Sequence, residues 1–203
     1  YRRRLQRGED HIKTMKAEFL PSLDCICILS SDLRINFHKV INRTNVNSDN
    51  IKPAGRVQTS TQQYVLAWDD VHKNLFTAGC ENEIVVWQVS EVKQQNENTL
   101  SIGMGSKYKM MATQMRVISD HTDSIQDLLV VVDPDFELSC LISASLDKKI
   151  NVYDLSLLRK IRTLLGHKSG ISSVAYDGLG ALYSGGFEYD VYVWDLDSGQ
   201  TFP

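Results

Sequence analysis

The chain has 203 residues, of which 42% are hydrophobic, and this suits a globular protein with one large domain or two small ones. Its 22 lysines and arginines face 25 aspartates and glutamates, so the net charge of −3 gives no overall attraction to nucleic acid or to an anionic membrane. No apolar run approaches the roughly 20 residues that a membrane-spanning helix needs.

Residues 1–10 form a basic segment, with four arginines among the first seven residues. The cluster from Arg2 to Arg7 could contact RNA or an acidic partner, but a solvated end of a longer polypeptide is the interpretation we favour. No apolar stretch follows the arginines, so the segment does not have the pattern of a secretory signal. Because the chain also does not begin with Met, we expect a fragment of a longer protein.

A block of alternating strand-like sequence then recurs three times, in residues 75–87, 141–153 and 182–194. Each block has an apolar strand, a hydroxyl residue, an acidic residue four positions later and an aromatic residue six positions after that. This order predicts a β-hairpin with a tight acidic turn. The hydroxyl residues are Thr77, Ser143 and Ser184, the acidic residues are Glu81, Asp147 and Glu188, and the aromatic residues are Trp87, Tyr153 and Trp194. Residues 30–38 are a weaker fourth copy, with His38 in the aromatic position.

The spacing between equivalent residues is similar from one copy to the next. His167 follows His121 by 46 residues, and Trp194 follows Tyr153 by 41, close to a period of roughly 40–45. With Gly166-His167, Tyr153-Asp154 and Trp194-Asp195, the chain resembles the WD40 repeat family over nearly its whole length. The resemblance implies an all-β, WD40-type β-propeller of about four blades, part of a larger propeller. The predicted blades are residues 11–57 (degenerate), 61–118, 121–164 and 167–203 (incomplete).

The resemblance also implies a polar network that pins the strands of each blade. One set would contain His121, Ser143, Asp147 and Tyr153, a second His167, Ser184, Glu188 and Trp194, and a third Thr77, Glu81 and Trp87. Indole, hydroxyl, imidazole and carboxylate groups can satisfy one another in sequence, and such a network is costly to break once it is buried. The third set lacks a histidine, because Thr61 stands at that position.

A catalytic interpretation of these residues is weaker. His121 next to Ser143 suggests a base and a nucleophile, but their recurrence in phase with the repeat favours a structural role, and no Gly-x-Ser-x-Gly elbow is present. Gly103 and Gly105 lack the third glycine of a dinucleotide fingerprint. We therefore predict no enzyme activity, no catalytic residues, no cofactor and no metal.

The four cysteines, Cys25, Cys27, Cys80 and Cys140, lack zinc-ligand spacing. Cys25 and Cys27 lie two apart in a strand, so they should point the same way. We expect reduced, mostly buried thiols in an intracellular protein.

Two polar loops, residues 42–53 and 91–109, lie between the third and fourth strand positions of their blades and need no secondary structure. The last blade ends before a fourth strand. We therefore expect either that the chain continues in a larger polypeptide or that a partner covers its open ends.

Three functions compete: a non-catalytic scaffold for protein–protein interactions in a large assembly, a substrate receptor, and a propeller enzyme, which the motifs disfavour. Residues 186–195 and 141–147 look like WD-repeat proteins of ciliary and flagellar axonemes. That resemblance implies axonemal or microtubule-associated partners, without a membrane or nucleic acid. The alternative is a nuclear or ribosome-assembly subunit whose arginine cluster contacts RNA; otherwise the location is the cytoplasm or the nucleus.

Overall fold

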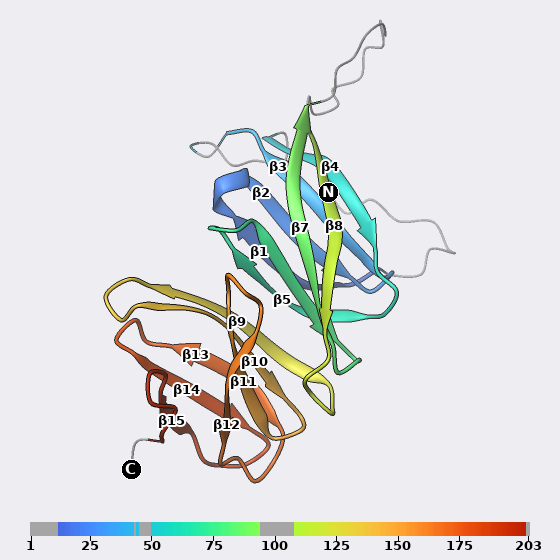
Figure 1. The fold of residues 1–203 in the computed structure, drawn as a ribbon. Helices are drawn as coiled ribbons and strands as arrows, with labels where there is room; N and C mark the ends of the chain where they lie inside the picture. Colours follow the sequence, from blue (N-terminus) through green and yellow to red (C-terminus); the bar gives the residue numbers. More distant parts are fainter. Residues whose placement is uncertain (1–11, 43, 45–49, 94–107, 202–203) are drawn as a thin grey trace, which may run out of the picture.

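The computed structural model describes residues 12–42, 44, 50–93 and 108–201. They form four antiparallel sheets that follow one another along the chain (Figure 1). Sheet one holds β1 (Thr14–Leu20), β2 (Cys25–Ser30), β3 (Arg34–Val40) and β4 (Ile51–Gln58), with a 3-10 helix, η1 (Pro21–Leu23), after β1. Sheet two holds β5 (Gln63–Asp69), β6 (Asn74–Gly79), β7 (Ile84–Lys93) and β8 (Tyr108–Ile118). Sheet three holds β9 (Ile125–Asp133), β10 (Leu138–Ser145), β11 (Lys149–Asp154) and β12 (Lys160–Leu165), and sheet four β13 (Ile171–Tyr176), β14 (Ala181–Gly186) and β15 (Tyr192–Asp195).

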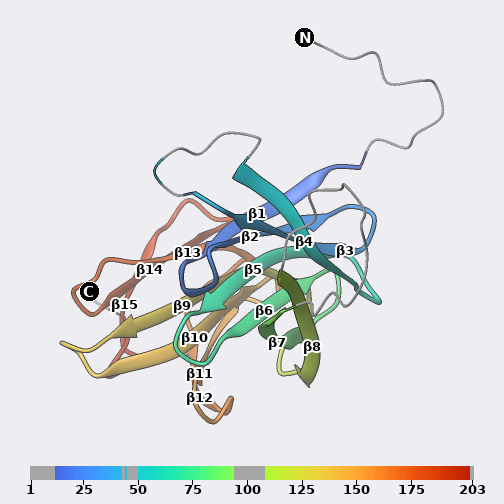
Figure 2. The ribbon, with the colours of Figure 1, turned by 90° about the horizontal axis from the view of Figure 1, so that it is seen from above.

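Each sheet packs on the next through its first strand, with β1 against β5, β5 against β9 and β9 against β13 (Figures 1 and 2). Strand order follows the chain in every sheet, so each is a simple meander. This is the arrangement of a β-propeller with four blades, and the predicted all-β propeller fold is confirmed. We number the blades 1 to 4 after the sheets.

The middle strands show how the sequence dictates this packing. Every residue of β6 is buried, and so are the six residues from Cys140 to Ser145 in β10. A strand between two other sheets has no solvent face, so small and apolar residues occupy both of its sides. In β14 only alternate residues, Leu182 and Ser184, are buried. Blade 4 is therefore covered on one side among the described residues.

The core lies in three layers, one between each pair of consecutive blades. Phe37 and Trp87 belong to the layer between blades 1 and 2, Phe76 and Tyr153 to the next, and Trp194 to the layer between blades 3 and 4. All five side chains are at most 5% exposed. Each blade thus has a leading face, turned toward the next blade in the chain, and a trailing face, turned toward the preceding one.

The strands bear on several expectations from the sequence. The sheets begin at residues 14, 63, 125 and 171 and end at residues 58, 118, 165 and 195. The predicted loop over residues 91–109 is shorter than expected, because β7 continues to Lys93 and β8 begins at Tyr108, whose backbones pair. Cys80 is exposed, whereas the other three cysteines are buried. Residues 1–10, His11 and the glycines at 103 and 105 lie outside the described residues.

Blade 4 has three strands, and Thr201 makes a single bridge to Trp194 beyond the turn that follows β15. Trp68-Asp69 ends an inner strand, β5. No helix in the described part of the chain has the length and apolar character needed to cross a membrane.

Two neighbouring glycines of β14 give a matched test of this packing. A Cβ atom on Gly186 would stand 2.1 Å from the carbonyl oxygen of Gly170, whereas one on Gly185 would meet nothing within 4 Å. We expect Gly186→Ala to lower the free energy of unfolding by about 1–3 kcal/mol, because the backbone of Gly170 must move. Gly185→Ala should change it by less than about 0.5 kcal/mol in the same urea titration. Equal effects of the two substitutions would contradict the strand pairing.

Candidate functional site

The predicted polar residues of blade 3 come together around one imidazole. His121 lies in the link before β9, and its Nδ1 is 2.9 Å from Asp147 Oδ2 in the turn after β10. Its Nε2 is 2.7 Å from Ser143 Oγ in the middle of β10. The Asp147 carboxylate also accepts the backbone N–H groups of Thr122 and Lys149. The network therefore holds the β10–β11 turn against the chain that enters the blade.

Tyr153 does not complete this network as expected. Its side chain is fully buried, but its hydroxyl makes no hydrogen bond among the described residues. Asn151 joins the network as well. Its Nδ2 lies 3.2 Å from His121 Nε2, and its Oδ1 accepts a hydrogen bond from the Thr163 hydroxyl at 2.7 Å. Asn151 lies directly opposite Ser143 in the pairing of β10 with β11, two residues before Tyr153 on the same strand, so its amide reaches the imidazole. Sequence reasoning missed Asn151 and Thr163, which the other two blocks do not share.

Blade 4 forms the full predicted chain of four groups. Trp194 Nε1 donates to Ser184 Oγ at 2.7 Å, and the same hydroxyl is 2.7 Å from His167 Nε2. His167 Nδ1 in turn bonds Glu188, whose other oxygen accepts the Lys168 N–H. The ring of His167 also packs 4.2 Å from that of Tyr192, centroid to centroid. The longer glutamate side chain thus reaches the histidine as aspartate does in blade 3.

Of the predicted network, blade 2 keeps only the bond between the tryptophan and the hydroxyl residue. Trp87 Nε1 donates to Thr77 Oγ1 at 2.9 Å, but Glu81 is exposed and bonds to no residue that the structure describes. Glu81 therefore departs from the predicted network, because this blade has no histidine to receive it. Gln63 and Thr61 occupy that region instead, joined by a 3.0 Å hydrogen bond.

The proton count explains the order of groups in blade 4. Trp194 can only donate, so the Ser184 hydroxyl accepts from it and donates to His167 Nε2, which leaves the Nδ1 hydrogen for Glu188. Burial disfavours the charged carboxylate of Glu188, but the hydrogen bonds from His167 and the Lys168 N–H outweigh this and lower its pKa. In blade 3, burial lowers the pKa of His121, although Asp147 opposes the shift. Burial likewise opposes ionisation of Asp147, yet the Thr122 N–H and His121 hold its pKa below the usual value.

Ser143, His121 and Asp147 have the distances of a catalytic triad, but not its accessibility. Ser143 is fully buried and His121 is 2% exposed, so no substrate carbonyl can reach the hydroxyl. Both ring nitrogens of His121 are engaged within the blade. The arrangement is thus suited to holding strands in register and not to nucleophilic attack. No group of three or more metal-ligating side chains gathers within the described residues.

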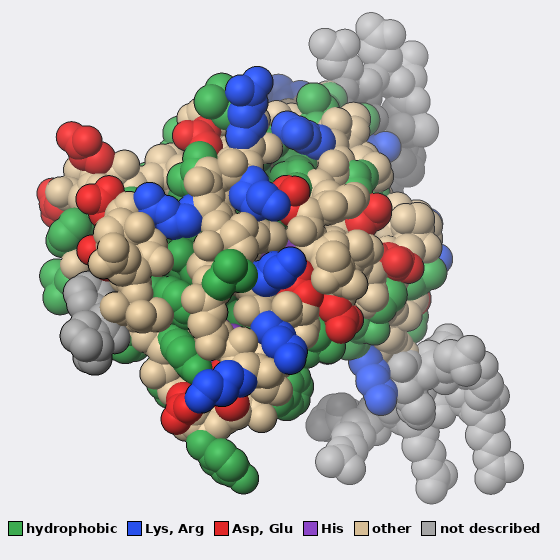
Figure 3. Space-filling model, turned by 60° about the horizontal axis from the view of Figure 1, so that its bottom comes forward, with side chains coloured by type: hydrophobic (Ala, Val, Ile, Leu, Met, Phe, Trp, Pro, Cys, Tyr) green, Lys and Arg blue, Asp and Glu red, His purple; other side chains and the backbone are tan. Residues whose placement is uncertain are grey.

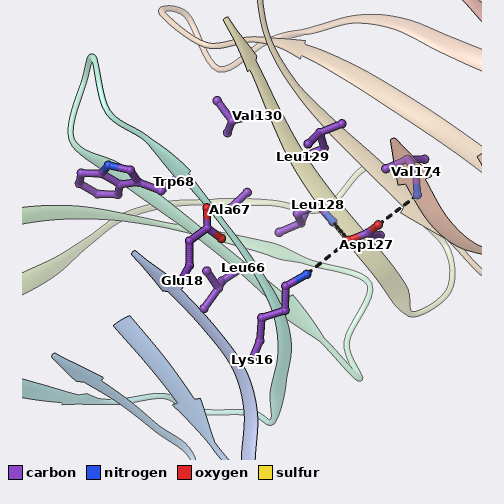
Figure 4. Close-up of a pocket in the computed structure, with 10 residues that line it drawn as sticks. All are labelled: Lys16, Glu18, Leu66, Ala67, Trp68, Asp127, Leu128, Leu129, Val130 and Val174. Atoms are coloured by element: carbon purple, nitrogen blue, oxygen red, sulfur yellow. Dashed lines mark hydrogen bonds and ion pairs between the residues drawn. The ribbon is translucent and has the colours of Figure 1, made fainter. Parts of the chain in front are cut away.

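A second candidate site lies where the inner strands of the four blades meet. A cavity of about 260 Å³ opens between them (Figure 4). Its lining residues are Lys16 and Glu18 of β1, Leu66, Ala67 and Trp68 of β5, Asp127, Leu128, Leu129 and Val130 of β9, and Val174 of β13. This cavity is the central channel of the propeller.

Asp127 joins three blades across this channel. Its Oδ2 accepts the Val174 N–H at 3.0 Å and faces the Ser173 hydroxyl at 3.3 Å, and its Oδ1 lies 3.8 Å from Lys16 Nζ. Figure 4 shows Lys16 reaching from β1 toward this carboxylate. Sequence patterns did not point to Asp127, because it belongs to no repeat position. Its partners come together only where β1, β9 and β13 converge.

Glu18 lies on the same channel wall and receives no hydrogen bond from the described residues. Burial raises the pKa of its carboxyl group, with Lys16 acting in the opposite direction. A half-buried carboxylate on the channel wall can accept hydrogen bonds from a basic group that enters the channel. No motif in the sequence pointed to it.

The family model described as "WD domain, G-beta repeat" matches residues 112–154 and 158–195. This chain contains WD40 repeats. The two matches end at the Tyr153-Asp154 and Trp194-Asp195 pairs, where the best-formed networks lie. WD40 repeat proteins are generally scaffolds for protein interactions.

Several curated proteins share sequence with this WD40 chain. Transcription factor unc-37 of Caenorhabditis elegans is 26% identical over 182 residues, covering 83% of this chain and 29% of that protein. Cilia- and flagella-associated protein 337 B of Tetrahymena thermophila is 27% identical over 133 residues, covering 65% and 9%. Mitochondrial division protein 1 of Kluyveromyces lactis is 36% identical over 74 residues, covering 36% and 10%. The chain thus spans less than a third of each of these relatives.

The lowered pKa of His121 predicts a pH dependence of stability. Because the folded chain binds this proton less readily than the unfolded chain, the free energy of unfolding should fall as pH drops through about 6.5, the usual histidine value. His121→Gln should remove this contribution, so that its stability between pH 8 and pH 5 varies less steeply than that of the wild type. The measurement is a series of urea titrations over pH. Parallel curves for the two proteins would contradict the assignment.

The Trp194 side chain gives a second stability prediction, because it is 1% exposed and bonds Ser184. Trp194→Ala should cost roughly 3–5 kcal/mol of unfolding free energy. Tyr189 of the same blade is fully exposed, so Tyr189→Ala should cost less than about 0.5 kcal/mol. Thermal unfolding of both variants measures the difference, and a loss at Trp194 as small as that at Tyr189 would exclude a buried blade network there.

Proposed function

We propose that this chain is a non-catalytic WD40 scaffold that holds proteins together in a large assembly, and that the assembly is the ciliary axoneme. The observation that carries the first part is the burial of both histidine networks. Each potential nucleophile and base is closed inside a blade and satisfied by its neighbours, with Ser143 and Ser184 at most 2% exposed. What the chain offers to other molecules is a rigid surface.

The outer surface suits several protein contacts. Figure 3 shows Lys and Arg side chains interspersed with Asp and Glu on one face, with hydrophobic side chains between them. Such a mixed surface favours protein partners over a polyanion, because a polyanion binds best to a surface of uniformly positive charge. Exposed apolar residues on the rim, such as Met115 and Ile161, add contact area, since each is 62% exposed.

The ciliary part rests on resemblance. Residues 186–195 have an aromatic turn, with Phe187 and Tyr189 flanking Glu188, and look like axonemal WD-repeat proteins. The alignment with a cilia- and flagella-associated protein over 65% of this chain supports the same location. The partners would then be axonemal proteins bound to microtubules.

A subunit of a nuclear assembly is the second candidate. The alignment with a transcription factor covers 83% of this chain, more than the ciliary alignment does. The channel adds a site for a receptor function, because Glu18 presents a half-buried carboxylate to a basic segment of a partner.

The location of the tagged full-length protein in its own cell decides between these candidates. We expect fluorescence along cilia or flagella that survives detergent extraction, with crosslinked neighbours among axonemal proteins. The fluorescent tag alone serves as the control. A nuclear signal, or one that detergent releases completely, would contradict the axonemal proposal and support the nuclear candidate or a receptor in solution.

A further inference from the structure

The outermost strand of blade 2 is the longest strand of the four sheets. β8 has 11 residues, whereas β4 and β12, the outermost strands of blades 1 and 3, have eight and six. Among the described residues, no strand pairs with the outer side of β8. Blades 1 and 3 flank blade 2, so this edge lies within the row of blades and not at either of its ends.

The hydrogen bonds of β7 show which backbone groups of β8 point outward. The Val89 N–H donates to the Lys73 carbonyl at 3.0 Å, in the direction away from β8. Ala112 lies opposite Val89 in the pairing of β7 with β8. Opposite residues of an antiparallel pair either exchange two hydrogen bonds or exchange none, so the N–H and C=O groups of Ala112 point to the open edge. By alternation along the strand, those of Gln114 point the same way.

The outermost strands of blades 1 and 3 carry features that oppose the addition of another strand. β4 contains Pro53, which has no N–H to donate to a further strand. In β12, Arg162 is half-buried, and its guanidinium group donates to the Leu196 carbonyl of blade 4 at 2.6 Å. β8 contains no proline, no glycine and no carboxylate. A bulge at Met115 interrupts its register with β7, so the regular open stretch lies before this residue.

Exposed apolar side chains accompany this open edge. Met111 is 46% exposed, Met115 is 62% exposed and Val117 is 37% exposed. The five residues from Thr113 to Val117 are all exposed. A strand that pairs with the edge would cover part of this apolar surface, and the flexible methionine side chains can adapt to the side chains that it brings.

The charge of the edge indicates which kind of strand it fits. Lys109 and Arg116 are the charged residues of β8, and both are basic. Beside the start of β8, a hollow of about 580 Å³ between this strand and blade 1 is lined by Lys109, Arg56 and His38, among others, and by no carboxylate. An acidic strand is complementary to these groups. A second copy of β8 would instead bring further basic side chains to the same edge, and like charges on neighbouring strands repel.

We propose that the open edge of β8 binds an extended, acidic segment of a partner protein as a fifth strand of blade 2. The main chain of that segment bonds the outward groups of Ala112 and Gln114, its apolar residues lie beside the exposed methionines, and its carboxylates lie near Lys109 and Arg116. The inference rests on the scaffold role proposed above and names the kind of segment that the scaffold holds. Its test is a binding measurement in solution, so it can fail while the cellular location stands.

Fluorescence anisotropy of a labelled peptide, Thr-Glu-Thr-Val-Thr-Val-Thr-Glu-Thr, titrated with the 203-residue chain tests this. We expect saturable binding that weakens as salt is added, because Lys109 and Arg116 attract the glutamates. The same peptide with lysine in place of both glutamates is the control and should not bind. Two N-methylated peptides test the backbone contact, one methylated at the valines and the other at the threonines. Because one side of an extended strand faces β8, one of the two should lose binding and the other should keep it.

Variants of the chain locate the contact. Gln114→Pro removes an outward N–H and no bond to β7, so it should weaken binding about tenfold. Gln114→Ala keeps the N–H and should bind like the wild type. Replacing both Lys109 and Arg116 with glutamate should reverse the preference, so that the lysine peptide binds and the glutamate peptide does not. Lys148→Glu, at an exposed position in the turn after β10, is the charge control and should leave binding unchanged.

Four results would overturn the proposal. The first is no binding of the glutamate peptide up to about 1 mM of the chain. The second is an equal effect of the two N-methylated peptides, a comparison that does not depend on the folding of any variant. The third is a Gln114→Pro chain that circular dichroism shows to be folded and that binds like the wild type. The fourth is a dimer of the chain that Gln114→Pro dissociates, because a second copy would then occupy the edge.

Discussion

The structure depends on one constraint: a blade of this chain cannot bury its apolar residues alone. The middle strands β6 and β10 have no polar side to turn toward water, because their residues are buried on both faces. Such a strand is stable only between two other sheets. The order of the blades and the three core layers follow from this requirement.

The polar networks fix the register of strands that the apolar layers have brought together. Face-to-face packing fixes which sheets touch, but a slip of one residue would exchange the two faces of a strand. The bond from Trp194 to Ser184 and on to His167 can form in one register only, and so can the bond from His121 to Ser143. Blade 2 has only the Trp87–Thr77 bond and still packs between two apolar layers, so its position does not require a histidine network.

The same burial that makes these networks structural separates them from catalysis. The distances of Ser143, His121 and Asp147 are those of a nucleophile, a base and an orienting acid, so distances alone would mislead. Accessibility decides, since a reacting carbonyl needs an open path to the hydroxyl. The channel differs: Glu18 and Asp127 are half-buried, lie beside open space and belong to no repeat position. Contacts that distinguish this chain from other WD40 chains are therefore expected in the channel.

The sequence by itself determined the repeat, because the period and the order of hydroxyl, acidic and aromatic residues are local properties of one hairpin. It therefore predicted the propeller fold, and it singled out His167, Ser184, Glu188 and Trp194, which meet in blade 4. Only the tertiary structure decided the rest. Asn151 contacts His121, and Glu81 bonds to no described residue, because both outcomes depend on strands and turns that are distant in sequence. Asp127 gained its partners from β1 and β13 only when the sheets were packed together, since burial and contact depend on the neighbours and not on the strand alone.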